Sequence, residues 1–122
     1  MDLNKILLFG IDGGTWKILR PLIEDGILPH FAEILQNGAY GVLESTIPPY
    51  SVTAWTSAFT GVNPGKHGLL DARIRIKEEI VPATSEFREV PTIWQMIAKN
   101  KEQTIVINDP SCYPPEPIGI HV

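Results

Sequence analysis

An α/β fold, with a mainly parallel sheet flanked by helices, is the class that the order of sequence patterns predicts. Apolar runs typical of strands occur at 5–11, 39–44 and 104–107, and segments with helical spacing lie between them. This alternation favours a parallel sheet, because parallel neighbours need a crossover connection that is usually a helix. The length of 122 residues predicts a single α/β domain spanning 1–122.

The first predicted strand is a continuous apolar run that ends at Asp12. Because it does not alternate with polar residues, we expect a central strand that is covered on both faces. Thr15 is placed to cap a following helix, which Pro21 kinks or ends early. Pro29 opens a second helix and Gly38 is placed to end it. A short strand then follows in the second apolar run.

The middle of the chain predicts a helix, a hairpin and another helix. The prolines before Ser51 exclude a helix upstream, so a helix begins near Ser51 and ends at Gly61 or soon after. Alternating basic and apolar residues over 72–81 predict a hairpin or flap. A further helix follows Pro91 and leads into the last predicted strand.

Charge and composition exclude several classes of partner. The formal net charge of -4 provides no positive field for nucleic acid phosphates, so no polymeric nucleic acid partner is expected. The longest early apolar run is too short to span a bilayer, so no membrane partner is expected. Cys112 is the single cysteine and cannot form an internal disulfide. These features predict a cytoplasmic protein in which Cys112 is buried and inert.

Asp12 is the first residue that could carry chemistry. It follows a rigid strand and precedes two glycines, which allow a ligand to approach the backbone. Such a carboxylate is suited to a metal ion, although Asp12 could equally cap the helix that begins near Thr15. The segment matches neither glycine-rich nucleotide-binding motif.

Ser51 is the second such residue, at the start of a predicted helix. Backbone N–H groups and the positive end of the helix dipole could bind a phosphate there, although an ordinary N-cap serine fits the local pattern too. A serine nucleophile needs a base or a metal. Because His30, His67 and His121 show no triad context, metal activation is favoured over a histidine base.

Five segments together resemble the type I phosphodiesterase and nucleotide pyrophosphatase family of the alkaline phosphatase superfamily. They are residues 10–13 (Gly-Ile-Asp-Gly), 48–57 (Pro-Pro-Tyr-Ser-Val-Thr-Ala-Trp-Thr-Ser), 60–68 (Thr-Gly-Val-Asn-Pro-Gly-Lys-His-Gly), 91–94 (Pro-Thr-Ile-Trp) and 112–117 (Cys-Tyr-Pro-Pro-Glu-Pro). Members hydrolyse phosphodiester or pyrophosphate bonds with two divalent metals, usually zinc. A threonine or serine becomes covalently phosphorylated or nucleotidylated during the reaction.

The resemblance implies roles for particular residues of this chain. Asp12 would bind one metal ion, and Ser51 would be the nucleophile and contact the same ion. Thr53 is the rival nucleophile, although its position matches one where the family commonly has proline. Ala54 replaces an asparagine that helps better-known members to bind phosphoryl oxygens. His67 is assigned no metal by the resemblance, and we expect it to stabilise a turn.

The resemblance also implies that the chain is the amino-terminal part of an alkaline-phosphatase-like catalytic domain, an incomplete version of the fold. The family's other aspartate and histidine ligands find no counterpart here, and Asp12 and Ser51 alone cannot complete a zinc site. Two functions are therefore expected. One is hydrolysis of a phosphodiester or nucleotide-like small molecule. The other is a catalytically incomplete module that binds phosphate or metal, or forms a homodimer through an exposed sheet edge.

Overall fold

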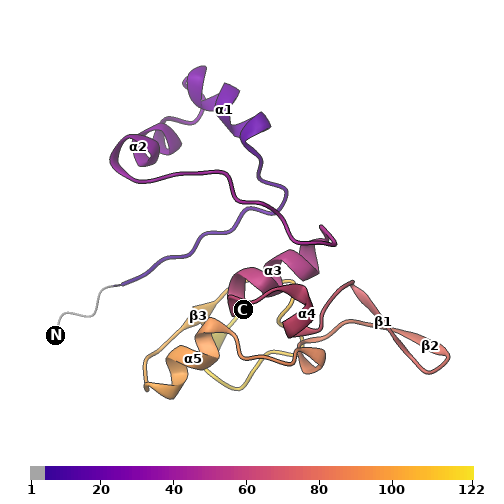
Figure 1. Cartoon of the computed structure of the whole chain (residues 1–122). Coiled ribbons are helices and arrows are strands. Elements are labelled where there is room, and N and C mark those ends of the chain that lie inside the picture. Colours follow the sequence, from indigo (N-terminus) through magenta and orange to yellow (C-terminus); the bar gives the residue numbers. More distant parts are fainter. Residues whose placement is uncertain (1–4) are drawn as a thin grey trace. The chain divides into compact units, whose positions relative to one another are not determined.

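The computed structural model describes residues 5–122 (Figure 1). The chain divides into two compact units, the first ending at Glu44 and the second spanning Ser45–Val122. Each unit has its own helices, and both sheets belong to the second unit. No helix within the described part of the chain has the length and apolar character needed to cross a lipid bilayer.

The first unit contains two nine-residue helices, α1 (Trp16–Glu24) and α2 (Pro29–Asn37). Thr15 caps α1 as predicted, because its hydroxyl accepts a hydrogen bond from the backbone N–H of Lys17 at 3.4 Å. Pro21 lies inside α1 without ending it. The indole of Trp16 donates to the carbonyl of Gly41 at 2.9 Å, so α1 is joined to the segment that follows α2.

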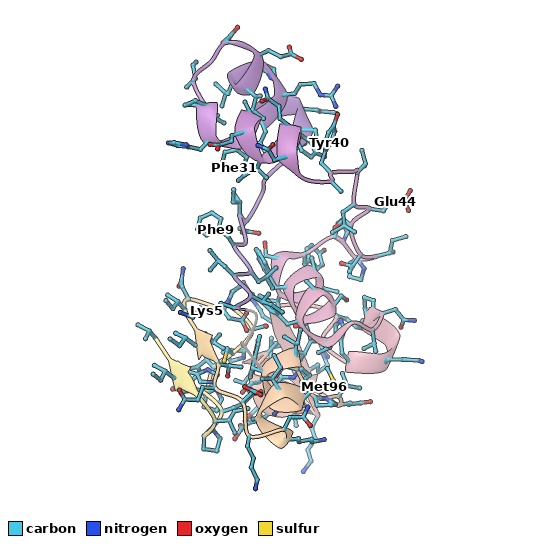
Figure 2. All side chains as sticks on the ribbon, turned by 90° about the vertical axis from the view of Figure 1, so that its left-hand side faces the viewer. Lys5, Phe9, Phe31, Tyr40, Glu44 and Met96 are labelled. Carbon is cyan, nitrogen blue, oxygen red and sulfur yellow. The ribbon has the colours of Figure 1, made fainter. Side chains whose placement is uncertain are left out.

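The two strands predicted in this unit, at 5–11 and 39–44, are wrong. Neither segment forms a strand, and the apolar side chains of both are largely exposed, with Ile6 at 90% and Phe9 at 76%. Figure 2 shows Phe9 on a stretch of ribbon that is neither helix nor strand. A central parallel strand is stable only when neighbouring strands satisfy its backbone groups and helices cover its faces. The described residues of this unit provide no such strand neighbours.

The second unit contains the helices α3 (Ser51–Thr60), α4 (Pro64–His67) and α5 (Ile93–Lys99), and the short 3-10 helix η1 (Ser85–Phe87). Gly61 ends α3 as predicted, with a φ of 72° that favours glycine. Thr92 begins α5 with a capping box, in which Thr92 and Gln95 bond each other's backbone N–H groups.

Two small sheets complete this unit. β1 (Arg73–Ile76) pairs antiparallel with β2 (Glu79–Pro82), in the region where alternation predicts a hairpin, and this hairpin extends away from α5 (Figure 1). β3 (Ile105–Val106) pairs in parallel with β4 (Ile120–His121). A mainly parallel sheet is therefore not formed by the described residues, which provide only this one short parallel pair.

The core of the second unit lies between α3, α4 and α5. Trp94 is buried, and its ring contacts the ring of Phe59 at a centroid distance of 5.1 Å. Phe59 in turn stacks on Trp55 at 5.5 Å. Leu69 is also buried, together with threonines on the inner faces of the helices, so a compact core forms without a large sheet.

Gly119 permits the close approach of β4 to β3. It has a φ of +66°, and a Cβ atom built on it would lie 2.5 Å from the carbonyl oxygen of Thr104. The next residue, Ile120, donates its backbone N–H to that same oxygen at 2.9 Å. Any side chain at position 119 therefore competes with the first hydrogen bond of the parallel pair.

We predict that Gly119→Ala lowers the free energy of unfolding by about 2 kcal/mol, because the new methyl group clashes with backbone and the positive φ is strained. Urea denaturation measures the change. Gly65→Ala is the matched control, since position 65 is helical and a Cβ there meets nothing closer than 3.4 Å. Equal effects of the two substitutions would contradict the prediction.

Candidate functional site

Asp12 lies in a tight turn that places its carboxylate at the surface. The carbonyl of Ile11 accepts a hydrogen bond from the N–H of Gly14 at 3.2 Å, and Gly13 adopts a φ of 68°. Asp12 itself is exposed. The capping interaction at the start of α1 comes from Thr15, so the function of Asp12 as a metal ligand stays a prediction.

Ser51 is the first residue of α3, and Tyr50 rather than Ser51 is the N-cap. The carbonyl of Tyr50 accepts from the N–H of Ala54 at 2.8 Å, which closes the first turn. Ser51 is exposed at the end of the helix where backbone N–H groups lack intrahelical partners and the dipole is positive. An anionic group could therefore contact both the hydroxyl and this helix end.

Thr53 lies in a different environment from Ser51. Its side chain is fully buried, and its hydroxyl oxygen has no hydrogen-bond partner among the described residues. The other buried threonines of α3 differ, because Thr56 and Thr60 each donate to the carbonyl four residues earlier, both at 2.7 Å. A substrate could reach Thr53 only if the structure opened around it.

Asp12 belongs to the first unit and Ser51 to the second. Their joint binding of one cation therefore stays a prediction. Each contributes one oxygen ligand, whereas zinc sites in proteins have three or four protein ligands. These two residues alone do not complete a metal site of the kind that the resemblance implies.

His67, at the end of α4, is fully buried. Its Nδ1 atom accepts from the N–H of Leu69 at 3.1 Å, so the neutral ring carries its proton on Nε2. Nε2 lies 2.8 Å from the hydroxyl oxygen of Ser57, and the ring also hydrogen-bonds the backbone of Thr53. A ring that donates toward Ser57 cannot also take its proton, so this pair is structural and joins α3 to the turn after α4.

Burial is the main reason that the pKa of His67 lies below its usual value of 6.5, and the positive charge of Arg88 lowers it further. The hydrogen bond with the backbone of Thr53 acts in the opposite direction. The expected role of His67 in stabilising a turn agrees with this environment. His30 is different, because its exposed ring lies 3.9 Å from the carboxylate of Glu33.

A buried polar cluster around Glu116 was not predicted from the sequence. Its carboxylate pairs with the guanidinium of Arg88 and accepts from the indole N–H of Trp94, and the hydroxyl of Thr92 donates to it at 3.4 Å. Cys112 lies beside it, with its sulfur 3.1 Å from Nδ1 of His121. No local pattern signals the pairing of residues 88 and 116, because they are distant in the sequence.

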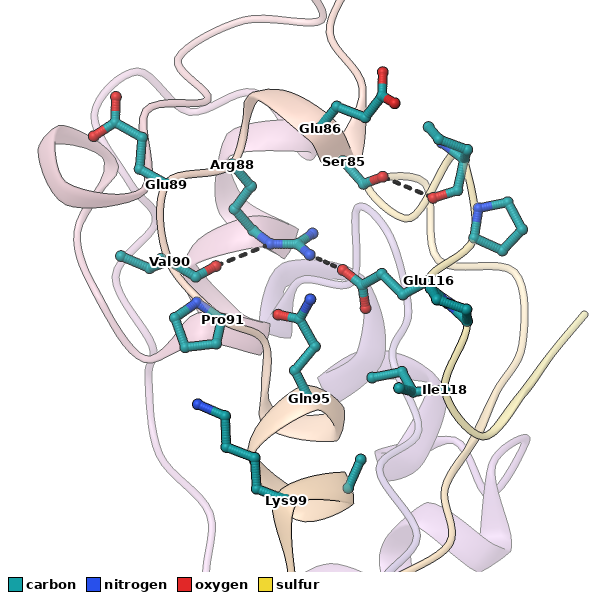
Figure 3. Close-up of a pocket in the computed structure, with 14 residues that line it drawn as sticks. Ser85, Glu86, Arg88, Glu89, Val90, Pro91, Gln95, Lys99, Glu116 and Ile118 are labelled. Carbon is teal, nitrogen blue, oxygen red and sulfur yellow. Dashed lines mark hydrogen bonds and ion pairs between the residues drawn. The ribbon is translucent and has the colours of Figure 1, made fainter.

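Arg88 and Glu116 also line an open cavity of 890 Å³ between η1, α5 and the loop after β3 (Figure 3). On one side the hydroxyl of Ser85 donates to the carbonyl of Pro114 at 2.7 Å. On the other side Gln95 and other residues of α5 form the wall. Two of the charged residues that line the cavity, Arg88 and Glu116, partly neutralise each other through their ion pair.

A model of the type I phosphodiesterase / nucleotide pyrophosphatase family matches residues 6–118, a range that includes Asp12, Ser51 and Glu116. The chain belongs to this family. Comparison with curated proteins and with solved structures gave no significant match. Membership of this phosphodiesterase family implies an alkaline-phosphatase-like α/β fold and typical metal dependence.

For this phosphodiesterase-family chain we predict that stability falls as the pH drops below 6.5. The unfolded state then binds more protons than the folded state, because the pKa of His67 is lower in the folded chain. His67 contributes a loss of up to about 1.4 kcal/mol per pH unit between its unfolded and folded pKa values. Above pH 6.5 this contribution to stability is fully retained.

Urea unfolding of the wild type and of His67→Gln at pH 7.5 and 5.5 measures this contribution. We expect a smaller loss between the two pH values in the variant, whatever its stability at pH 7.5. His30→Gln is the control, since the ring of His30 is exposed, and it should behave as the wild type does. If His67→Gln shows the same pH dependence of stability as the wild type, the lowered pKa of His67 does not cause it.

Proposed function

We propose that this chain hydrolyses phosphodiester or pyrophosphate bonds through a covalent seryl-phosphoryl or seryl-nucleotidyl intermediate at Ser51. The observation that carries the proposal is the position of Ser51, exposed at the first residue of α3 within the segment matched by the family. The burial of Thr53 supports Ser51 over its rival. Family membership supports the class of reaction.

In the first step the exposed Ser51 hydroxyl gives its proton to solvent, and its oxygen forms a bond to phosphorus while the bond from phosphorus to the leaving oxygen breaks in line. Water then attacks the same phosphorus and loses one proton to solvent, while the Ser51 oxygen departs and takes up a proton from solvent, which restores the hydroxyl. Backbone N–H groups at the start of α3 would stabilise the charged phosphoryl oxygens. Ala54 has no polar side chain, so these backbone groups must replace the asparagine that some family members use.

We further propose two divalent metal ions, of the zinc type, as cofactors. Asp12 and Ser51 would each provide an oxygen ligand to one of them, and a metal would lower the pKa of the serine hydroxyl. Additional ligands are required to complete such a site. The proposed substrate is a phosphodiester or nucleotide-like small molecule, and the proposed location, favoured by the single cysteine, is the cytoplasm.

The alternative function is that of a catalytically incomplete homologue that binds phosphate or metal, or forms a homodimer. Exposed apolar side chains favour this alternative, because Ile6 and Leu7 at 90% and 87%, and Ile105 and Ile120 on the short parallel pair, lack the cover expected of an α/β core. A second copy that pairs with the edge of β3 or β4 would extend the sheet and cover part of this surface.

Substitution at Ser51 separates the two functions. In the presence of Zn²⁺, we expect Ser51→Ala to lower the turnover of bis-p-nitrophenyl phosphate on the order of 10³-fold or more, because the nucleophile is removed. Thr53→Val is the matched control. It keeps the shape of the buried side chain and removes an unpaired hydroxyl, so activity should be retained.

If the wild type with Zn²⁺ has no turnover above that of Ser51→Ala, the hydrolase proposal fails for this chain. Sedimentation equilibrium then tests the alternative. A stable dimer would support the homodimer, whereas a monomer that binds neither phosphate nor Zn²⁺ by calorimetry would exclude the binding module as well.

A further inference from the structure

We propose that Cys112, Glu116 and His121 form a binding site for one divalent cation of the zinc type, separate from the proposed site at Asp12 and Ser51. One ligand atom from each of the three side chains lies within 4.8 Å of the others. Within residues 5–122 this is the one group of three histidine, cysteine or acidic side chains that are so close together. It includes neither Asp12 nor Ser51.

The distances within the group are near those of a metal centre. The sulfur of Cys112 and Nδ1 of His121 are 3.1 Å apart. In a tetrahedral site with zinc–sulfur and zinc–nitrogen bonds of ordinary length, these two atoms would be about 3.5 Å apart. A small rotation of either side chain would therefore admit an ion between them.

The three ligands lie on backbone segments that are restrained by a strand pair or by prolines. His121 is in β4, where it pairs with Val106 of β3. Its ring packs edge-on with the ring of Trp94, and the two ring centroids are 6.2 Å apart. Cys112 and Glu116 lie in the loop between these strands, which contains Pro110, Pro114, Pro115 and Pro117. Because proline fixes its own φ, this loop loses little additional freedom when it binds an ion.

The carboxylate of Glu116 is oriented by partners that would act as the outer contacts of a metal site. Arg88 pairs with Oε1, and Trp94 donates to Oε2. The hydroxyl of Thr92 also donates to Oε2, at 3.4 Å. An ionised carboxylate has about four lone-pair sites, so these three donors leave one for an ion. Residues that fix a ligand in this manner are a general feature of metal sites. The positive charge of Arg88 opposes a cation, and burial raises the pKa of the Cys112 thiol, so the ion must displace the thiol proton as it binds. The thiolate that remains then offsets the charge of Arg88.

An ordinary hydrogen-bonded core group is the competing explanation for the cluster. It accounts for the contact between the sulfur of Cys112 and Nδ1 of His121. Nε2 of His121 is buried and has no hydrogen-bond partner among the described residues, and an ion held at Nδ1 would leave it so. Buried polar atoms in native structures nearly always have partners. The observation that favours a cation site is the convergence of a thiol, an imidazole and a carboxylate within 4.8 Å of one another, which a hydrogen-bonded core group does not require.

The ligand types select the class of ion. A thiolate and an imidazole favour Zn²⁺ and its substitute Co²⁺ over Mg²⁺ and Ca²⁺, which prefer oxygen ligands. Three protein ligands leave one tetrahedral position for water or an external ligand, as in open zinc sites. Glu116 also lines the 890 Å³ cavity, which gives solvent a route to its carboxylate (Figure 3).

Titration of the reduced full chain with Co²⁺ tests the site by absorption spectroscopy. We expect one equivalent to produce a thiolate-to-cobalt charge-transfer band together with the visible bands of a tetrahedral ion. Cys112→Ser should abolish the charge-transfer band, and His121→Gln should weaken Co²⁺ binding by about 100-fold or more, since even outer-shell changes cost 10- to 100-fold. His30→Gln is the matched control and should bind as the wild type does.

The double variant Asp12→Asn, Ser51→Ala separates this proposal from the proposed hydrolase site. Oxygen ligands at those positions cannot give a thiolate band, so the band should persist in the double variant even if hydrolysis is lost. A band absent from the wild type, or one that persists in Cys112→Ser, would overturn the proposal. Hydrolysis that depends on Ser51 would remain unaffected by either outcome.

A second measurement needs no variant at the cluster. Cys112 is the only cysteine in the chain, so alkylation by iodoacetamide reports on its thiol alone. We expect Zn²⁺ to slow alkylation at least 10-fold in the wild type and in the double variant. An unchanged rate at saturating Zn²⁺ would overturn the proposal, even if Cys112→Ser and His121→Gln fail to fold.

Discussion

The carboxylate of Glu116 is the group on which the organisation of the second unit depends. Its buried ion pair with Arg88, the residue after η1, and its hydrogen bond from Trp94 of α5 join these segments to a loop that is distant in the sequence. Removal of one partner of a buried ion pair typically costs 3–5 kcal/mol, because an uncompensated charge remains. The same contacts hold the loop from which β4 returns beside β3. The short parallel pair and the ring of His121 are thus positioned by a polar cluster rather than by a large apolar core.

The sequence predicted local features of the fold well, because their causes lie within a few residues. Thr15 caps α1, Gly61 ends α3 and residues 73–82 form a hairpin, and each depends on neighbouring backbone groups. The strands predicted at 5–11 and 39–44 are absent, since a strand depends on partners that may lie anywhere in a chain. An apolar run records a preference for burial, but it does not provide the neighbouring strand that makes burial possible.

The candidate site shows the same division between local and non-local information. Ser51 and Thr53 are two residues apart on α3, so their side chains differ by about 200° around the helix axis. This difference in direction explains why Ser51 is exposed and Thr53 is buried, and it can be predicted from helical periodicity alone. The roles of Glu116 and His121 could not be found in the same way, because their partners are brought together only by the loop and the parallel pair. Cys112 is buried as expected, and its contact with His121 joins two residues that no local pattern relates.

The exposed run from Ile6 to Phe9 has a consequence for the behaviour of the chain during synthesis. Short apolar segments with high β propensity can add to one another in growing aggregates, and charged residues at their ends limit that growth. Lys5 and Asp12 are such gatekeepers, one on each side of the run. In that position the carboxylate proposed to bind a metal would also limit aggregation before any ligand arrives. Neutralising Asp12 to probe catalysis would remove this protection, and loss of solubility must then be distinguished from loss of chemistry.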